Sequence, residues 1–305
     1  MTTAVLLIAH GTVEKLDDLP EFLRNIRRGH APDPELVHEV RRRYEAIGGK
    51  SPLLDICGRL TQKLEAALQV PVALAMRLWD PYPKDVLAKL AARGVDRVVV
   101  LPLAQHSAHI YGESVAEAAQ ALAAETGKTM QVVPSGNWGN HQALIACYET
   151  RVRKALQSLD VARTHVLFSA HSLPVFIIRS GDAYETEFRA SVEKLQASLG
   201  AACPHSSVIF QSQGMSKGPG GRPVEWLGPD LQTALRAAKD AGAAHVLVAP
   251  VGFLADHVEI LYDLDIEAAA WAKELGLGLS RTASLNDDDD FVSALAAVAR
   301  PMIDA

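Results

Sequence analysis

Residues 94–102 read GVDRVVVLP, and residues 242–250 read GAAHVLVAP. In both, a short apolar run follows a glycine and ends at a proline, as is typical of a strand buried on both faces of a parallel sheet. Four further runs have the same character: Ala4–Ala9, Val70–Met76, His165–Ala170 and Ser207–Gln211. Stretches of helical composition alternate with them: 54–69, 83–93, 114–126, 143–158, 184–199, 229–241 and 262–275. This alternation predicts βαβ units and therefore an α/β fold.

The two halves of the chain resemble each other around these strands. If the alignment of the two glycine-to-proline runs is continued without a gap, His109 aligns with His257. Likewise, Leu6–His10 (LLIAH) echoes Val166–His171 (VLFSAH), so a histidine twice follows the first strand of a half. An internal duplication explains this pattern, and chance similarity of two βαβ units is the alternative.

From the repeat we predict two similar Rossmann-like lobes, each with a parallel sheet flanked by helices. The predicted lobes span residues 1–157 and 158–305. Because the carboxyl ends of the strands face the ligand crevice in such sheets, His10 and His171 are expected to lie there.

Composition excludes several classes of protein. The 305 residues carry a net charge of −6, which argues against nucleic-acid binding, and no apolar run is long enough to span a bilayer. The N-terminus lacks a basic region before its first apolar stretch, so we expect a cytoplasmic protein without a signal peptide or membrane anchor. Lys217–Pro223 (KGPGGRP) lacks the spacing of a phosphate-binding loop. The odd, scattered cysteines predict neither disulfides nor an iron–sulfur cluster: Cys57, Cys147 and Cys203.

The segment Asp256–Glu267 contains an unusual row of acids. Glu259, Asp263 and Glu267 follow one another at intervals of four residues, and no lysine or arginine stands three or four positions from any of them. On an α-helix they would form one acidic stripe whose like charges repel. Such a row suits the passage of a hydrated divalent cation, although a solvated helix face is the ordinary interpretation.

A histidine ends one of the predicted strands. His171 stands in Ser169–Pro174 (SAHSLP), where a proline-terminated turn follows the strand. An imidazole there could bind a transition metal or accept a proton near neutral pH, and a structurally satisfied histidine is the alternative.

Arginines gather near the N-terminus of an otherwise acidic chain. Because guanidinium groups match carboxylates in a bidentate manner, they could hold an anionic substrate, with Arg27 and Arg28 the favoured members. Surface charge balanced by neighbouring glutamates is the alternative. The group comprises Arg24, Arg27, Arg28, Arg41, Arg42 and Arg43.

Several motifs together resemble the signatures of the ferrochelatase family, in the family's order. They extend over residues 4 to about 270, and in combination they are specific. They are Ile26–Gly29, Arg43–Gly49, Ser51–Leu53, Ser169–Pro174, Gln211–Gly214, Trp226–Asp230 and Gly252–Asp265. The resemblance implies a chelatase fold of two Rossmann-like lobes around a porphyrin cleft, and an enzyme that inserts Fe²⁺ into a porphyrin in haem biosynthesis.

The resemblance also implies roles for individual residues. His171 matches the histidine that binds metal and handles a proton, and Glu259 matches the acid that faces it across the ring. Asp263 and Glu267 match outer acids proposed as a path for the metal. Four further residues match family positions that line the porphyrin site: Arg27, Arg43, Tyr44 and Ser51.

The short polar segment 13–40 resembles the bacterial enzymes that metallate coproporphyrin III. That substrate has four propionates, and more arginines suit more carboxylates. We therefore expect coproporphyrin III to be favoured over protoporphyrin IX.

His10 departs from the pattern of those enzymes, which have tyrosine at this position. It could contact the porphyrin and act as a further metal ligand, and imidazole could alter the metal preference. The setting Ala9–Gly11 (AHG) is also found in cobalt and nickel chelatases, so an enzyme for another metal or a reduced tetrapyrrole such as sirohydrochlorin stays open. His106 and His109 lie nearby without an assigned role.

The expected partners are a porphyrin and ferrous iron, with Fe²⁺ as a substrate and no permanently bound cofactor. We expect a monomer. A porphyrin or haem carrier without turnover is the alternative from another class of protein, although a carrier would not need Glu259 to face the metal.

Overall fold

The computed structural model describes residues 2–214 and 223–305, so residues 217–222 of the loop Lys217–Pro223 lie outside the described residues. The chain divides into two compact units. Unit 1 comprises Met1–Ala143, Ala255–Val258 and Asn286–Ala305, and unit 2 comprises Leu144–Leu254 and Glu259–Leu285.

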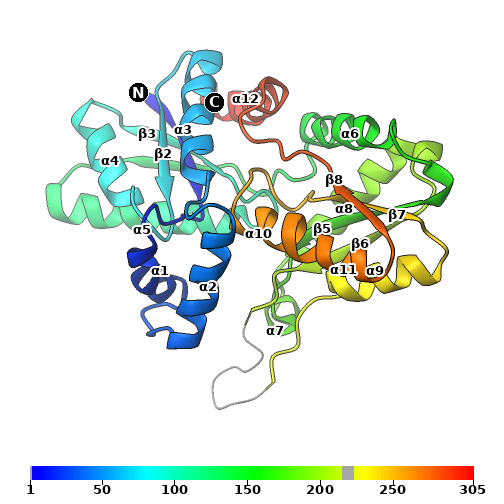
Figure 1. Cartoon of the computed structure of the whole chain (residues 1–305). Coiled ribbons are helices and arrows are strands. Elements are labelled where there is room, and N and C mark those ends of the chain that lie inside the picture. Colours follow the sequence, from blue (N-terminus) through cyan, green and yellow to red (C-terminus); the bar gives the residue numbers. More distant parts are fainter. Residues whose placement is uncertain (1, 215–222) are drawn as a thin grey trace. The chain divides into compact units, whose positions relative to one another are not determined.

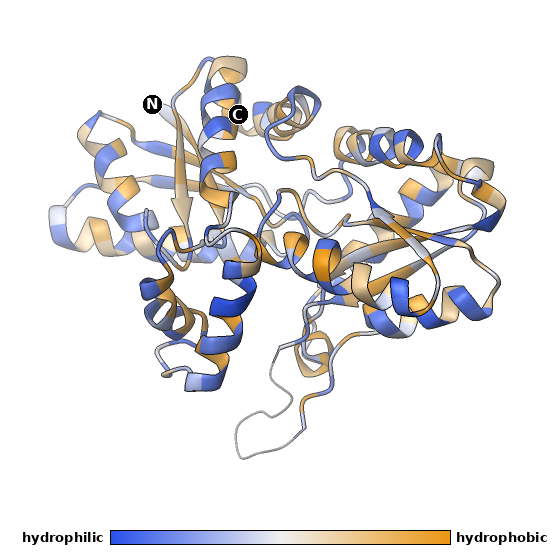
Figure 2. Cartoon of the chain, viewed as in Figure 1, coloured by the Kyte–Doolittle hydropathy of each residue, from blue (hydrophilic) through white to orange (hydrophobic). Residues whose placement is uncertain are grey.

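The sheet of unit 1 is parallel, with the strand order β2-β1-β3-β4. Its central strand β1 is buried almost completely, because β2 and β3 pair with its two edges and helices pack on both faces. Figure 2 shows the strands as largely hydrophobic along their length, as double burial requires. The strands are β1 (Thr3–Ala9), β2 (Val72–Met76), β3 (Arg97–Pro102) and β4 (Gln131–Pro134).

Helices cover both faces of this sheet (Figure 1). On one face, α4 (Pro83–Ala92) and α5 (Ala108–Thr126) pack on alternate residues of β1. On the other face lies α3 (Leu53–Leu68), against which α12 (Asp289–Ile303) packs. Two shorter helices, α1 (Leu19–Ile26) and α2 (Pro34–Ala46), follow β1 and share a small apolar cluster around Phe22 and Tyr44.

Unit 2 repeats this arrangement with the strand order β6-β5-β7-β8, all parallel. Each strand of unit 2 occupies the position of its counterpart in unit 1, which confirms the predicted pair of similar α/β sheets. The strands are β5 (Thr164–His171), β6 (Ser206–Gln211), β7 (His245–Ala249) and β8 (Gly278–Arg281).

Two layers of helices also enclose the sheet of unit 2 (Figure 1). One face packs on α9 (Leu231–Asp240) and α11 (Ala269–Glu274). On the other face, Phe188 of α8 (Tyr184–Leu199) meets Phe210 of β6, and α6 (Gln142–Leu156) bonds to α8 through Arg153. Short helices follow the ends of β5 and β7, namely α7 (Val175–Arg179) and α10 (Val258–Leu261).

All six strands predicted from the sequence are present, but the prediction missed the edge strands β4 and β8. Each has only four residues, all of them exposed or half-buried, so neither presents a buried apolar run. The predicted helix 262–275 is not one α-helix, because Asp263–Ala268 forms a π-helix in which Glu267 N–H donates to the Tyr262 carbonyl, five residues back.

The last helix belongs to unit 1. The Arg97 guanidinium on β3 donates to the Met302 carbonyl at 2.7 Å, and α12 packs along α3. The first division between the compact units therefore falls after Ala143, and residues 286–305 belong to the first unit. The predicted domain boundary between residues 157 and 158 stays a prediction.

Among residues 2–214 and 223–305, no helix combines the length and hydropathy that crossing a bilayer requires.

The turn after β7 passes unusually close to β5. Gly252 N–H donates to the Ser169 carbonyl at 2.8 Å, and a Cβ added to Gly252 would lie 2.6 Å from Ala170 Cα. Only glycine fits this approach without moving backbone.

We predict that Gly252→Ala lowers the free energy of unfolding by about 1–3 kcal/mol, because a methyl group there must displace a strand. Gly58→Ala is the control, since a Cβ at Gly58 in α3 meets nothing within 4 Å. Replacing a helical glycine by alanine should stabilise the protein by about 0.5–1 kcal/mol. Denaturant unfolding of both variants measures this, and equal stabilities would contradict the packing account.

Candidate functional site

His171 is the last residue of β5, and two hydrogen bonds fix it. Its carbonyl accepts from the Tyr184 hydroxyl at 2.8 Å. The ring atom Nδ1 lies 2.5 Å from the Ser172 carbonyl, which only an N–H can satisfy. Nε2 is therefore the ring atom left for a metal or a proton.

Glu259 presents its carboxylate to that atom. It stands in α10, after β7, and its Oε1 lies 3.4 Å from His171 Nε2. Parallel strands end at the same edge of their sheet, which is why residues following β5 and β7 meet. Both side chains are about one-third exposed, at 36% for His171 and 32% for Glu259, so solvent and solutes reach them.

The separation of these two atoms suits a divalent transition metal. Bonds of about 2.0–2.2 Å to a nitrogen and an oxygen at tetrahedral angles place the two ligand atoms roughly 3.4 Å apart. The distance between the two ligand atoms thus matches one bound ion, or one shared proton when no ion is present.

The charge of Glu259 controls the protonation of His171. Burial by itself would lower the pKa of the imidazole, but the Glu259 carboxylate, its hydrogen bond, the Ser172 carbonyl and Asp263 together raise it from 6.5 to about 9. In the free protein His171 is thus an imidazolium paired with a carboxylate at neutral pH.

The acidic row continues from Glu259 into the π-helix. Asp263 is buried, at 4% exposure, and its carboxylate accepts a very short hydrogen bond from the Ser212 hydroxyl. Glu267, four residues after Asp263, is half-buried. Because a π-helix has more residues per turn than an α-helix, spacing by four does not by itself align Glu267 with the other two acids. Roles for Asp263 and Glu267 in metal delivery stay predictions.

The residues that support this row have no local signal in the sequence. Ser212 has a left-handed φ of 59°, uncommon for serine, and Gln211 Nε2 donates to the Glu259 carbonyl at 3.4 Å. The motif Gln211–Gly214 could be noticed only through its resemblance to a known signature. No pattern in the sequence marked Tyr184, which holds the His171 carbonyl.

Unit 1 has its own histidine at the end of a strand. His10 follows β1 and is exposed, with Nδ1 3.4 Å from the Tyr111 hydroxyl and an edge-on contact with Phe22. This placement at a strand end confirms the repeat seen with His171. Binding of a metal or porphyrin by His10 stays a prediction.

The predicted porphyrin-binding residues occupy the α1–α2 region and the start of α3. Arg28 is exposed at a left-handed φ of 54°, and Arg27 and Arg43 are half-buried. Tyr44 and Ser51 are buried, with the Tyr44 hydroxyl 2.9 Å from the Thr12 hydroxyl and Ser51 Oγ accepting from Leu53 N–H.

The arginines of α2 are paired with acids, which agrees with the alternative interpretation of these arginines as balanced surface charge. Glu39 accepts from Arg42 and Arg43 at 2.9 Å, and the hydrogen bond from Arg42 is the main reason that the pKa of Glu39 falls to about 2 despite partial burial. Arg41 pairs with Asp17. Substrate binding by Arg27, Arg28, Arg43, Tyr44 and Ser51 stays a prediction.

His106 and His109 differ in their surroundings. His109 is exposed on α5, whereas His106 is only 2% exposed and packs so tightly against Gly139 that a Cβ there would clash with its ring. Burial lowers the pKa of His106 to about 3, so it is a neutral packing group.

In the described part of the chain, no cluster of three or more His, Cys, Asp or Glu side chains is arranged to hold a metal ion. The pair His171 and Glu259 provides two ligand atoms.

Comparison with known proteins identifies relatives of the whole chain. The family model described as Ferrochelatase matches residues 2–302. A protein named Ferrochelatase from Acidobacterium capsulatum is 35% identical, over 99% of this chain and 94% of its own length. A protein named Coproporphyrin III ferrochelatase from Geobacillus thermodenitrificans is 32% identical, over 97% of this chain and 95% of its own length.

Among solved structures, SirB from Bacillus subtilis with Fe³⁺ has a similar fold. The TM-score is 0.62 at 12% identity, and the match covers 98% of this chain and 95% of SirB. At this identity the likeness concerns the fold alone.

We predict that Glu259→Gln lowers the pKa of His171 by about 2 units, because an amide removes the carboxylate that outweighs the effect of burial. NMR titration of the imidazole measures it. Asp265→Asn is the control, since Asp265 pairs with Arg281 instead. A pKa that stays near 9 in Glu259→Gln would show that Glu259 does not hold the proton on His171.

We also predict that His106 makes stability depend on pH. Its folded pKa of about 3 lies below the unfolded value of 6.5, so its contribution is complete above pH 6.5 and declines as pH falls toward 3. Between pH 7 and pH 5 the loss is about 2 kcal/mol of unfolding free energy.

Denaturant unfolding of the wild type, His106→Gln and His109→Gln at both pH values tests this. His106→Gln should lose less stability between them than the other two proteins. Identical losses in all three would refute a buried neutral His106.

Proposed function

The chain belongs to the ferrochelatase family, whose members are metal chelatases, a class of lyase, and from this premise we propose that it inserts Fe²⁺ into a porphyrin, with coproporphyrin III favoured over protoporphyrin IX. The observation that carries the proposal is the pair His171 and Glu259, with 3.4 Å between Nε2 and Oε1. The proposal includes a cytoplasmic, monomeric enzyme without a permanent cofactor.

The chemistry of insertion explains why this pair is suitable. A free porphyrin loses two N–H protons when a metal enters, so the enzyme must handle a cation and protons at one place. The pair holds one proton in the free protein, and that proton must pass to solvent before His171 acts. The neutral imidazole and the carboxylate can then each bind a transition metal or accept a proton from the porphyrin. A metal held by only two protein atoms keeps open positions for the porphyrin nitrogens.

The fixed orientation of His171 favours catalysis over storage. Its Nδ1–H bond to the Ser172 carbonyl directs Nε2 toward Glu259, and the Tyr184 hydroxyl holds the main chain of the same residue. Preorganised groups lower the barrier because they need not reorient during the reaction.

Coproporphyrin III is favoured because it has four carboxylates. Arg28 is exposed and Arg27 half-buried beside it at the end of α1, so both can approach an anionic ring substituent. The relative from Geobacillus thermodenitrificans carries that substrate in its name, which agrees with this choice.

His10 supports a second candidate, a chelatase for another metal or for a reduced tetrapyrrole such as sirohydrochlorin. Its imidazole is exposed at the end of β1, and nitrogen ligands suit Co²⁺ and Ni²⁺ as well as Fe²⁺.

We predict rapid metallation when the protein is incubated anaerobically with Fe²⁺ and coproporphyrin III. His171→Ala and Glu259→Gln should each lower kcat by at least about 100-fold, as expected when a group that transfers protons is removed. Loss of the free porphyrin absorbance measures the rate. His165→Gln is the matched control, because His165 stands at the other end of β5 and pairs with Ser207.

Parallel reactions separate the candidates. Faster turnover of protoporphyrin IX would contradict the preferred substrate, and Co²⁺ insertion into sirohydrochlorin without Fe²⁺ insertion into either porphyrin would favour the second candidate. Tight porphyrin binding without metallation, unchanged in both variants, would indicate a carrier.

A further inference from the structure

A four-residue segment leads the chain to Glu259. Ala255–Val258 belongs to unit 1, and Glu259 is the first residue that returns to unit 2. Apolar contacts hold both ends of the segment, because Ala255 packs with the cluster around Cys57 and Val258 with the cluster around Tyr44.

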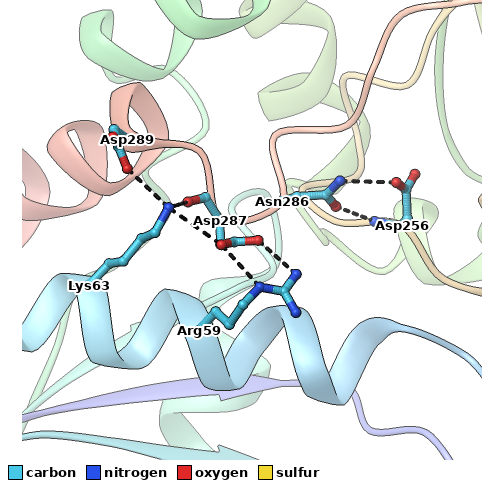
Figure 3. Close-up of polar contacts among 6 residues, drawn as sticks. All are labelled: Arg59, Lys63, Asp256, Asn286, Asp287 and Asp289. Carbon is cyan, nitrogen blue, oxygen red and sulfur yellow. Dashed lines mark hydrogen bonds and ion pairs between the residues drawn. The ribbon is translucent and has the colours of Figure 1, made fainter.

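Asn286 holds the middle of this segment with two hydrogen bonds (Figure 3). The Asp256 N–H donates to Asn286 Oδ1 at 2.8 Å, and Asn286 Nδ2 donates to Asp256 Oδ2 at 3.0 Å. One amide thus satisfies both the main chain and the side chain of the same residue. Asn286 has a left-handed φ of 49°, a conformation that asparagine tolerates better than most residues.

The residues after Asn286 are fastened to α3. The Arg59 guanidinium donates to both carboxylate oxygens of Asp287, at 2.8 and 3.1 Å, and Lys63 donates to the Asp287 carbonyl and to Asp289 (Figure 3). Because α3 lies on the sheet of unit 1, Asn286 is an anchored donor and acceptor and not part of a loose loop.

We propose that Asn286 is a positioning residue for metal insertion: by fixing Asp256, it limits the backbone freedom of the short segment that leads to Glu259. This inference rests on the proposed function. Glu259 is three residues from Asp256, so freedom gained at Asp256 is passed along the short chain to the carboxylate. A displacement of about 1 Å at a reacting group can cost up to about 100-fold in rate, which makes such an anchor consequential.

The test compares three changes in the full-length protein. Asn286→Gly keeps the left-handed backbone and removes both hydrogen bonds. Asn286→Asp keeps an acceptor for the Asp256 N–H but sets two carboxylates against each other. Combining Asn286→Asp with Asp256→Asn restores one donor and one acceptor across the contact. Lys63→Met is the matched control, because the two Arg59–Asp287 bonds still fasten this part of the chain to α3 and both bonds to Asp256 remain.

Two readouts are needed. The first is kcat and the porphyrin KM for Fe²⁺ insertion, and the second is backbone amide exchange over residues 254–262, which does not require turnover. Asn286→Gly and Asn286→Asp should lower kcat about tenfold with an unchanged KM, and should speed exchange in this segment about tenfold. The double change should recover kcat to within about threefold of the wild type, and Lys63→Met should alter neither quantity.

Three outcomes would overturn the inference: an unchanged kcat in Asn286→Gly, a raised porphyrin KM with kcat intact, or an equal loss of kcat in Lys63→Met. Failure of the proposed function looks different, because the wild-type protein itself would then metallate no porphyrin.

Discussion

Parallel strands end on one side of their sheet, and this constraint brings the chemistry of the protein together. In unit 2 the first strand, β5, ends in His171, and the chain after its neighbour β7 turns at Gly252 and reaches Glu259 within ten residues of the strand. Neither side chain needs a long loop to reach the other. The close approach of Gly252 to β5 keeps that path short.

Charged side chains gather at this same edge of the sheet. A buried charge without a partner would destabilise the fold, so each of them needs one. The imidazolium of His171 compensates Glu259, and Ser212 donates to the buried carboxylate of Asp263. Both supporting serines are placed by the sheet, because Ser172 and Ser212 directly follow β5 and β6. The proposed site is thus kept polar and ordered.

The sequence predicted the long buried strands and the duplication, because β1, β3, β5 and β7 are continuous apolar runs and double burial imposes that pattern. It also pointed to His171 and Glu259, through a strand-end histidine and an acidic row. The edge strands β4 and β8 escaped prediction because half-buried strands of four residues have no distinctive pattern.

The rest depends on contacts between residues far apart in the chain. The π-helix at Asp263–Ala268, the left-handed Ser212 and the bonds of Asn286 have no local signature. His106 could not be separated from His109 by sequence, since only tertiary packing against Gly139 buries the first and not the second.

The central claim is that His171 and Glu259 form one metal site, and binding of Co²⁺ tests it most directly. Co²⁺ is a coloured divalent ion close to Fe²⁺ in ligand preference, so its visible spectrum reports coordination without turnover. The account predicts that the wild type and His165→Gln bind Co²⁺ alike, and that His171→Ala and Glu259→Gln each bind it at least about tenfold more weakly with an altered spectrum. Equal affinity and an unchanged spectrum in both site variants would contradict it.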